Sequence, residues 1–242
     1  MGSALLAPSG LAARGARGDE GARARKCRDF CVPSRGGAGL APPTPNFIIM
    51  RPIFLIGFMG CGKTTLGKAL AKALGRQFVD LDLYIEGRYH ATVRQIFAAR
   101  GEAGFRELER KVLNEVADFE DVVIACGGGT PCHFGNMAHM LGRGLTVYLT
   151  VPPRQIAGRL SLPGSRARRP LVDGMSPDQL LDYVTAAIAE REPFYSRAEI
   201  TFCASRIEDA EQTAETAARL ASVVLSRESR GESPRERHGD AP

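Results

Sequence analysis

The sequence predicts an α/β domain built on a parallel β-sheet with helices on both faces. Short apolar runs alternate with stretches of helical periodicity along the middle of the chain, and a glycine-rich phosphate-loop pattern joins the first run to the first helix. Strands that alternate with helices imply right-handed crossovers between parallel strands. The runs show little polar alternation, which is typical of strands covered on both faces.

The individual elements follow from length and periodicity. The runs with strand character are residues 52–56, 77–81, 122–126, 146–151 and 200–203. Helical periodicity is found in residues 63–74, 93–100, 105–116, 134–141, 154–160, 179–190 and 210–225. Ser176, Pro177 and Gln179 form an N-cap, a first-turn proline and a capping-box partner, so a preceding loop ends there. Pro193 is expected to break the helix and to leave Arg191 near its end.

The two ends of the chain differ in composition from its middle. Residues 1–49 are rich in Ala, Gly, Arg and Pro and lack periodicity, and residues 227–242 mix Arg, Glu, Ser, Gly and Pro. Both segments are predicted to be disordered, which leaves a folded domain over residues 50–226. Acidic residues and few Ser or Thr argue against an organelle transit peptide in the first segment. Met50, directly before the first strand, suggests an upstream extension that the fold does not need.

Composition and charge exclude several classes of function. The net charge of +5 divides into +4 for residues 1–50 and zero for residues 227–242, which leaves +1 for the folded part. This charge gives no support to a nucleic-acid or membrane partner. No apolar run reaches the roughly 18 residues that a spanning helix needs. The six cysteines lack zinc-site spacing and the density of a disulfide scaffold, so we expect reduced thiols and a cytoplasmic protein.

The strongest motif is the phosphate loop. Residues 57–64 read GFMGCGKT, which matches GxxxxGK[ST] between a predicted strand and a predicted helix. Glycines allow backbone N–H groups to point at phosphate oxygens, and the helix N-terminus adds partial positive charge. Lys63 can reach the β- and γ-phosphates, and the Thr64 hydroxyl can bind Mg²⁺. The sequence therefore predicts nucleotide binding.

Two further motifs lie at strand ends. Asp80 and Asp82 end the second predicted strand, where alternation would direct both carboxylates toward the ligand crevice. One could serve the Mg²⁺ shell and the other a substrate hydroxyl, although an Asp at such a position can instead cap the next helix. Residues 127–129 are three glycines that can bring a ligand against backbone N–H groups, or simply form a tight turn. No acidic residue follows the third strand directly, which favours Asp80 for the metal.

Three groups of arginines complete the candidate site. Arg106 and Glu109 lie three residues apart on a predicted helix, where Glu109 could hold the guanidinium for a substrate carboxylate. Taken alone, such a pair is more often a solvated surface pair. Arg169 lies with other arginines in a Gly- and Pro-containing stretch that suggests a mobile lid over about residues 161–175, or merely a solvated loop. Arg191 follows near the next helix end.

Together these motifs resemble the shikimate kinase family. The resemblance rests on GFMGCGKTT at 57–65, DLD at 80–82, GFRELE at 104–109, CGGGTP at 126–131, RPLV at 169–172 and REPFY at 191–195. It covers about residues 50–225. It implies a P-loop kinase fold similar to nucleoside monophosphate kinases, with a five-stranded parallel sheet flanked by helices and a mobile lid.

The resemblance also implies roles for particular residues. ATP would be bound by the phosphate-loop residues and by the lid arginine: Gly60, Cys61, Gly62, Lys63, Thr64, Thr65 and Arg169. Thr64 and Asp80 would serve Mg²⁺. Shikimate would be bound by Asp82, Arg106, Gly128 and Arg191. Lys63, Asp82 and Arg169 would act in transfer of the γ-phosphoryl group of ATP to the 3-hydroxyl of shikimate. We expect a monomer.

Some questions stay open at this stage. Residues 159–169 form a slightly longer segment than the family pattern, so an adenine-contacting arginine could be Arg159 or Arg166. The alternative enzymes are related kinases for gluconate or a nucleoside monophosphate, which Asp82, Arg106 and Arg191 disfavour. An alternative of another class is a regulatory module that binds ATP without turnover. Such a module would normally lack part of the catalytic set, which is complete here.

Overall fold

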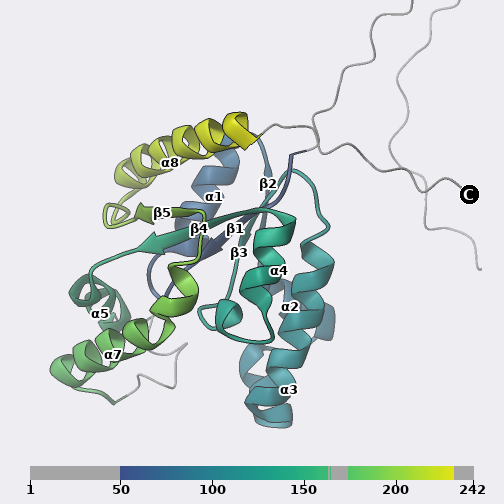
Figure 1. Ribbon diagram of the computed structural model, residues 1–242. Helices are drawn as coiled ribbons and strands as arrows, with labels where there is room; N and C mark the ends of the chain where they lie inside the picture. The colour runs from purple at the N-terminus through teal and green to yellow at the C-terminus, as the bar shows by residue number, and fades with distance from the viewer. Residues whose placement is uncertain (1–49, 163, 165–173, 232–242) are drawn as a thin grey trace, which may run out of the picture. The chain divides into compact units, whose positions relative to one another are not determined.

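The computed structural model describes residues 50–162, 164 and 174–231. The strands are β1 (Ile53–Ile56), β2 (Gln77–Asp80), β3 (Val122–Ala125), β4 (Leu145–Thr150) and β5 (Ile200–Cys203). The helices are α1 (Lys63–Leu74), α2 (Leu81–Tyr89), α3 (Val93–Val116), α4 (Asn136–Arg143), α5 (Pro153–Ser161), α7 (Pro177–Tyr195) and α8 (Ala210–Gly231), with a 3₁₀ turn η1 (Thr130–Cys132). Figure 1 shows how they are arranged.

The strands form a single five-stranded parallel sheet in the order β2-β3-β1-β4-β5. β1 lies at the centre, where Ile53 pairs with Val123 on one side and with Leu145 on the other. The predicted fold class is therefore confirmed. Since all strands run in the same direction, the loops that follow β1, β2 and β3 leave the sheet at one edge, which is where ligands bind in such folds.

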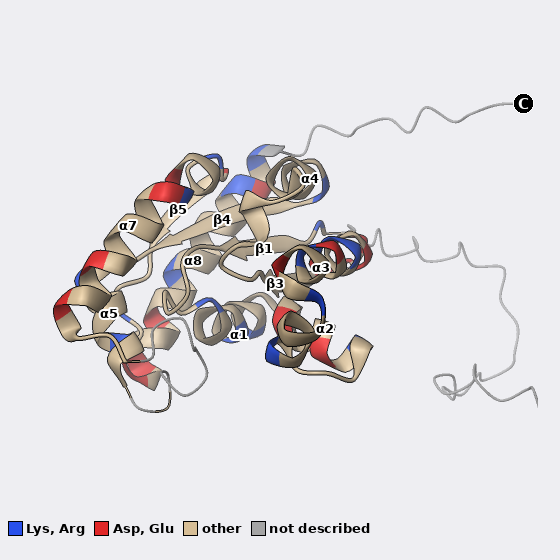
Figure 2. Ribbon diagram, turned by 90° about the horizontal axis from the view of Figure 1, so that it is seen from below, with Lys and Arg blue, Asp and Glu red and all other residues tan. Residues whose placement is uncertain are grey.

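Alternate residues of the central strand enter different halves of the core. Ile53 and Leu55 belong to a cluster formed with α1, α5, α7 and α8, whereas Phe54 and Ile56 belong to a cluster formed mainly with α2, α3 and α4. All four side chains are fully buried. This explains why the run is apolar throughout: successive side chains point to opposite faces, and helices cover both. In Figure 2 the strands are largely tan, and the helices carry charges of both signs.

The local signals for helix starts and breaks are confirmed in two places. Ser176 and Gln179 form the expected capping box at the start of α7. The gap predicted between the helical stretches 93–100 and 105–116 is present as a kink within α3, because Gly101 has φ +66° and ψ −177°. Such a conformation is open to glycine and interrupts the helix without ending it.

The prediction for the end of the second strand was wrong. β2 ends at Asp80, and Leu81 begins α2, a helix that was not predicted. Asp80 is the N-cap of this helix, and its carboxylate accepts hydrogen bonds from the amides of Asp82 and Leu83. The first four amides of a helix have no partner within it, so they favour such a cap, and this outweighs the strand propensity of the preceding residues. α2 lacks a strong apolar periodicity, which is why the pattern missed it.

The predicted end of the sixth helical stretch was also wrong. α7 continues past residue 190 to Tyr195 and includes Pro193 in its last turn. A proline costs one backbone hydrogen bond in a helix. Here the fully buried Tyr195 and the bond from the Ser196 amide to the Glu192 carbonyl hold the final turn. Arg191 therefore lies within the helix and not at its broken end.

The last helix is longer than predicted. α8 runs to Gly231, so residues 227–231 are helical and the predicted tail cannot begin at 227. Arg76 fixes this extension because its Nη2 donates to both carboxylate oxygens of Glu228, at 2.8 and 2.9 Å, and the Arg76 side chain is only 4% exposed. Residues 1–49, 163, 165–173 and 232–242 lie outside the described part of the chain, and most of the predicted lid is among them. Within the described ranges, no helix is long and apolar enough to cross a membrane.

Because Arg76 is almost completely buried, we expect Glu228→Gln to lower the free energy of unfolding by about 2 kcal/mol. Thermal unfolding should show this as a decrease of roughly 4–8 °C in Tm. Glu215→Gln is the matched control, since Glu215 lies on the same helix and pairs with Arg206 at an exposed site. A chain shortened to residues 50–226 should lose as much stability as Glu228→Gln does. A chain shortened to residues 50–231 keeps Glu228 and should not lose this stability. Equal Tm values for the two shortened chains would contradict the role of this pair.

Candidate active site

The phosphate loop connects β1 to α1 and depends on glycines at two tight positions. Gly62 is the N-cap of α1 in the left-handed region with φ +97°, and a Cβ there would overlap the Ile207 side chain. Gly57 has φ +141°, and a Cβ there would lie 2.7 Å from the carbonyl oxygen of Leu149. Both positions therefore require glycine for conformation and for space.

Lys63 is held within the loop that it serves. Its ammonium group donates to the carbonyl oxygens of Gly57 at 2.8 Å and Phe58 at 3.0 Å. A cation in this position faces the same pocket as the N-terminus of α1, where partial positive charge favours phosphate. The Lys63 contacts are therefore ones that a bound phosphate group would compete for.

Thr64 and Asp80 meet across the start of the pocket. The Thr64 hydroxyl donates to Asp80 Oδ2 at 2.7 Å, and Asp80 Oδ1 accepts the two cap bonds from α2. Capping thus fixes one carboxylate oxygen and leaves the other beside the hydroxyl. Two oxygen donors at this spacing fit the preference of Mg²⁺ for hard oxygen ligands.

Asp82 lies in the first turn of α2 and lines the same pocket. Solvent reaches its side chain through the pocket mouth, yet protein atoms surround the carboxyl group on its other sides. This desolvation, together with the negative charges of Asp80 and Glu109, raises its pKa to about 6, and Lys63 opposes the shift. No described donor forms a hydrogen bond with its side chain, so Asp82 is free to accept a proton or a hydroxyl group.

The pocket that these residues share has a volume of about 520 Å³. It brings together the phosphate loop, the two aspartates and the start of the triple-glycine loop (residues 127–129). The predicted residues that line it are Gly60, Gly62, Lys63, Thr64, Thr65, Asp80, Asp82 and Gly128. Cys61, by contrast, is fully buried and does not line the pocket. Cys61 is therefore a small packed residue within the phosphate loop and not part of the pocket wall.

Sequence reasoning missed part of the pocket wall. Ile207 and Glu208, in the loop between β5 and α8, line the pocket together with Arg159 of α5. Arg159 pairs with Glu208 at 2.8 Å and donates to the carbonyl oxygen of Gly60 at 3.3 Å. Of the two arginines left open for adenine contact, Arg159 is thus at the pocket, and Arg166 lies outside the described residues. No local motif marked the β5–α8 loop in the sequence.

Arg106 belongs to a buried network on the other side of the triple-glycine loop. Its guanidinium donates to Glu109 at 2.8 Å, and Glu109 is only 1% exposed. Glu109 also accepts a hydrogen bond from the Thr130 hydroxyl at 2.5 Å. A Cβ at Gly129 would overlap the Arg106 guanidinium, so this glycine allows the arginine to pack on the loop. The alternative of a solvated Arg–Glu pair is therefore excluded.

Arg191 reaches the same loop from α7. Its guanidinium lies over the Phe58 ring, 5.2 Å from the centroid, and 3.6 Å from where a Cβ of Gly128 would be. Arg191 and Arg106 both lower the pKa of the Cys132 thiol, although burial raises it overall. Two arginines that are distant in the sequence thus come close to one short segment. Arg169, the predicted lid arginine, lies outside the described residues.

Comparison with known proteins identifies relatives of this chain. A family model described as Shikimate kinase matches residues 59–221. A shikimate kinase of Phocaeicola vulgatus is 52% identical over 163 residues, or 67% of this chain and 92% of that protein. The crystal structure of shikimate kinase from Bacteroides thetaiotaomicron is 48% identical, with a TM-score of 0.69 over 73% of this chain and 99% of that one. Shikimate kinase from Acinetobacter baumannii, solved in complex with shikimate, is 34% identical, with a TM-score of 0.63 over 74% and 94%.

The raised pKa of Asp82 predicts that its charge destabilises the ligand-free protein. A carboxyl group whose pKa is higher in the folded state weakens folding when it is ionised, so the cost is absent below pH 3.8, develops up to about pH 6 and is complete above it. In EDTA at pH 7.5, Asp82→Asn should therefore increase the free energy of unfolding by about 1 kcal/mol, a value reduced for solvent screening at the open mouth. Tm should increase by roughly 2–4 °C.

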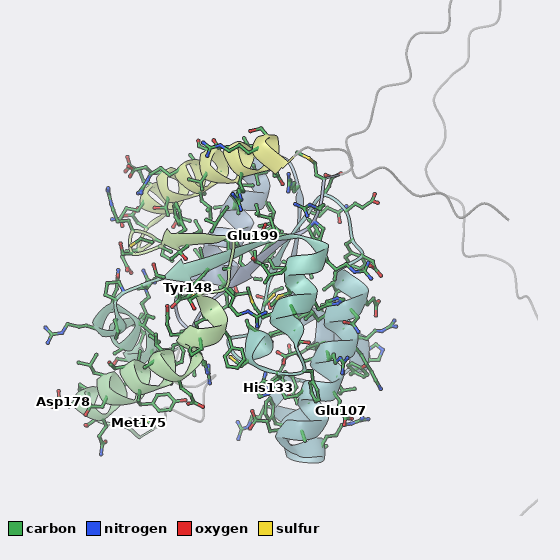
Figure 3. The ribbon with its side chains drawn as sticks, in the orientation of Figure 1. Glu107, His133, Tyr148, Met175, Asp178 and Glu199 are labelled. Carbon is green, nitrogen blue, oxygen red and sulfur yellow. The ribbon has the colours of Figure 1, made fainter. Side chains whose placement is uncertain are left out.

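Two comparisons make this prediction specific. The gain in Tm should shrink as the pH is lowered from 6 toward 4, because the carboxyl group is then protonated in both states. Glu107→Gln, on the exposed side of α3 (Figure 3), should leave Tm unchanged at every pH. A lower Tm for Asp82→Asn at pH 7.5 would show that the carboxylate stabilises the fold.

Proposed function

The chain belongs to the shikimate kinase family, and we propose that it transfers the γ-phosphoryl group of ATP to the 3-hydroxyl of shikimate, giving shikimate 3-phosphate and ADP. Membership of a kinase family implies ATP as the phosphoryl donor. The observation that carries the proposal for this chain is that Asp82 lines one pocket with the phosphate-loop lysine, while two arginines flank the adjoining triple-glycine loop.

On this proposal, the phosphate loop and Lys63 bind the phosphates. Loop amides and the Lys63 ammonium neutralise negative charge, which is the main catalytic requirement of phosphoryl transfer. Lys63 would exchange its bonds to the Gly57 and Phe58 carbonyls for bonds to phosphate oxygens. Gly60, Gly62, Thr64 and Thr65 would contribute to the same site from the pocket wall, and Arg169 would add lid charge.

Thr64 and Asp80 are the residues proposed to hold Mg²⁺. Their oxygens lie 2.7 Å apart, and the cap bonds to α2 fix the orientation of Asp80. When bound, Mg²⁺ would offset charge on the phosphates and help to orient them. The capping role and the metal role of Asp80 are therefore compatible, because each uses a different carboxylate oxygen.

Asp82 is proposed to accept the proton of the attacking hydroxyl. As the hydroxyl oxygen forms a bond to the γ-phosphorus and the bond to the ADP oxygen breaks, the proton passes to the carboxylate. A pKa of about 6 in the free site leaves Asp82 mostly ionised near neutral pH and able to take up this proton. Lys63 provides an opposite charge nearby.

Arg106 and Arg191 are proposed to bind the shikimate carboxylate, with Gly128 between them. Glu109 holds the Arg106 guanidinium by a buried hydrogen bond, and the Phe58 ring supports that of Arg191. Planar guanidinium groups suit a carboxylate in geometry as well as in charge. Gluconate and nucleoside monophosphates do not present a compact ring acid of this kind, which disfavours both alternative kinases.

We also propose that one chain acts alone, in the cytoplasm. The near-neutral folded part and the sparse cysteine pattern of the sequence support this proposal.

The experiment that tests the function is a coupled assay for ADP with shikimate, gluconate, CMP and AMP as acceptors. We expect ADP release well above the background ATPase rate with shikimate alone. Release with gluconate or a nucleotide alone would support one of the alternative kinases. Binding of ATP without release in any assay would support the regulatory module.

Lys63→Ala should decrease kcat by at least about 100-fold, or about 3 kcal/mol of transition-state stabilisation, because Lys63 meets charge that develops on the transferred group. Lys68→Ala is the matched control. Lys68 lies five residues further along the same helix and is exposed, so its variant should keep the parent kcat. Near-normal turnover of Lys63→Ala would refute the phosphate-loop mechanism.

Arg106→Lys and Arg191→Lys should each increase KM for shikimate by about tenfold or more, with KM for ATP changed by less than about twofold. Arg110→Lys, one turn beyond Arg106 on the exposed face of α3, is the control and should change neither value.

The methyl ester of shikimate should be a poor substrate of the parent enzyme, because it lacks the carboxylate charge. Arg106→Lys and Arg191→Lys should lose little further activity on the ester, because both changes remove the same interaction. Equal use of ester and acid would show that neither arginine binds a carboxylate.

A further inference from the structure

The three carbonyl groups of the triple-glycine loop are held in different ways. The carbonyl of Gly127 accepts a bond from the Thr130 amide at 3.2 Å, and that of Gly129 accepts one from the Cys132 amide at 3.0 Å. Both are local backbone bonds. The carbonyl of Gly128 instead accepts from the Tyr195 hydroxyl at 2.5 Å, across 67 positions of sequence. The middle peptide therefore depends on a side chain from α7.

The bond from Tyr195 determines the direction of an amide group as well as that of the Gly128 carbonyl. A planar trans peptide directs its C=O and the next N–H in opposite directions, so fixing the Gly128 carbonyl also fixes the Gly129 amide. The bond from the Thr130 amide to the Gly127 carbonyl closes a turn around this peptide. Type I and type II turns differ by a flip of the middle peptide, and glycine allows both, so that bond alone does not fix its direction. Among the described residues, no acceptor binds the amides of Gly128 and Gly129. Both donors are therefore unpaired among these residues in the free protein, where Gly128 lines the pocket and Gly129 is buried.

Tyr195 also lies beside the arginine that α7 supplies. Arg191 and Tyr195 are four residues apart in one helix, which places them on the same face. The Tyr195 ring is fully buried, and burial raises the pKa of its hydroxyl against the opposing charge of Arg191. The hydroxyl consequently stays protonated near neutral pH and remains a donor. A Cβ at Gly128 would lie 3.3 Å from the Met59 amide nitrogen, so the peptide is packed against the phosphate loop as well.

We propose that Tyr195 is a positioning residue for the acceptor substrate, which holds the Gly128–Gly129 peptide and Arg191 in one fixed arrangement. The proposal rests on the proposed function in taking that acceptor to be shikimate. Tyr195 does not itself reach the reacting atoms. It acts through the conformation of the Gly128–Gly129 peptide and through the neighbouring guanidinium, so its loss should weaken binding of the acceptor and leave the nucleotide site intact.

Tyr148 offers a matched control within the same aromatic pair. The two rings lie 5.0 Å apart, and the Tyr148 hydroxyl donates to Glu192 at 2.8 Å. Figure 3 shows Tyr148 on β4, close to the C-terminal end of α7. Removal of the Tyr148 hydroxyl breaks a comparable bond near Arg191 but leaves the triple-glycine loop untouched. If the substitutions only loosened α7, both variants would be affected. If the Tyr195 hydroxyl fixes the triple-glycine loop, only Tyr195→Phe would be affected.

The test compares Tyr195→Phe with Tyr148→Phe, which each keep the ring. We expect Tyr195→Phe to increase KM for shikimate by about tenfold, as expected for one lost hydrogen bond, with KM for ATP within about twofold of the parent. Tyr148→Phe should leave both KM values within about twofold. Similar increases in both variants, an increase for ATP as well, or an unchanged KM for shikimate in Tyr195→Phe would each overturn the proposal.

Amide hydrogen exchange in the free enzyme provides a second measurement that needs no substrate. Exchange of the Thr130 and Cys132 amides, which donate to the Gly127 and Gly129 carbonyls, should be at least about fivefold faster in Tyr195→Phe than in the parent and in Tyr148→Phe. Unchanged exchange would show that the hydroxyl does not hold the loop, and would overturn the proposal. If the parent did not phosphorylate shikimate, the proposed function would fail, but faster exchange in Tyr195→Phe alone would still support the hold on the loop.

Discussion

The structure depends on the parallel pairing of β1 with β3 and β4 at the centre of the sheet. Pairing in one direction brings the phosphate loop, the Asp80 cap and the triple-glycine loop to the same edge. Each of these segments follows a different strand, and none could form the pocket by itself. Both faces of β1 are fully buried, so its register has no freedom to slip without exposing core side chains.

Charge at this edge is balanced imperfectly in the free protein. Asp80, Asp82 and Glu109 lie close enough for their charges to affect one another, while Lys63 partly compensates them. Glu109 is satisfied by Arg106 and Thr130, and Asp80 by Thr64 and the α2 amides. Asp82 is the member left without a hydrogen bond among the described residues, and desolvation together with the charges of Asp80 and Glu109 raises its pKa. A residue that is poorly accommodated in the fold is the one proposed to do the proton transfer, which is a common feature of functional sites.

The C-terminal turn of α7 links the two halves of the proposed substrate site. Pro193 removes one helical hydrogen bond from this turn, and burial of Tyr195 compensates for the loss by anchoring it to the sheet and to Gly128. Arg191 is thereby directed at the loop that Arg106 approaches from α3. Two arginines, 85 positions apart in the sequence, therefore lie against neighbouring glycines of one loop, Arg191 at Gly128 and Arg106 at Gly129.

The sequence by itself determined the fold class, the five strands and the phosphate loop, because apolar periodicity and glycine spacing are local properties. The roles of the candidate residues followed from the resemblance of its motifs to the shikimate kinase family. The sequence patterns misplaced the end of β2, the end of α7 and the end of α8, where Asp80, Tyr195 and Glu228 act through capping, burial and pairing with distant groups. The contribution of Arg159, Ile207 and Glu208 to the pocket, and the bond from Tyr195 to Gly128, were decided only by tertiary structure. Such contacts join segments whose separation in sequence carries no pattern, so they exist only once the sheet has brought the segments together.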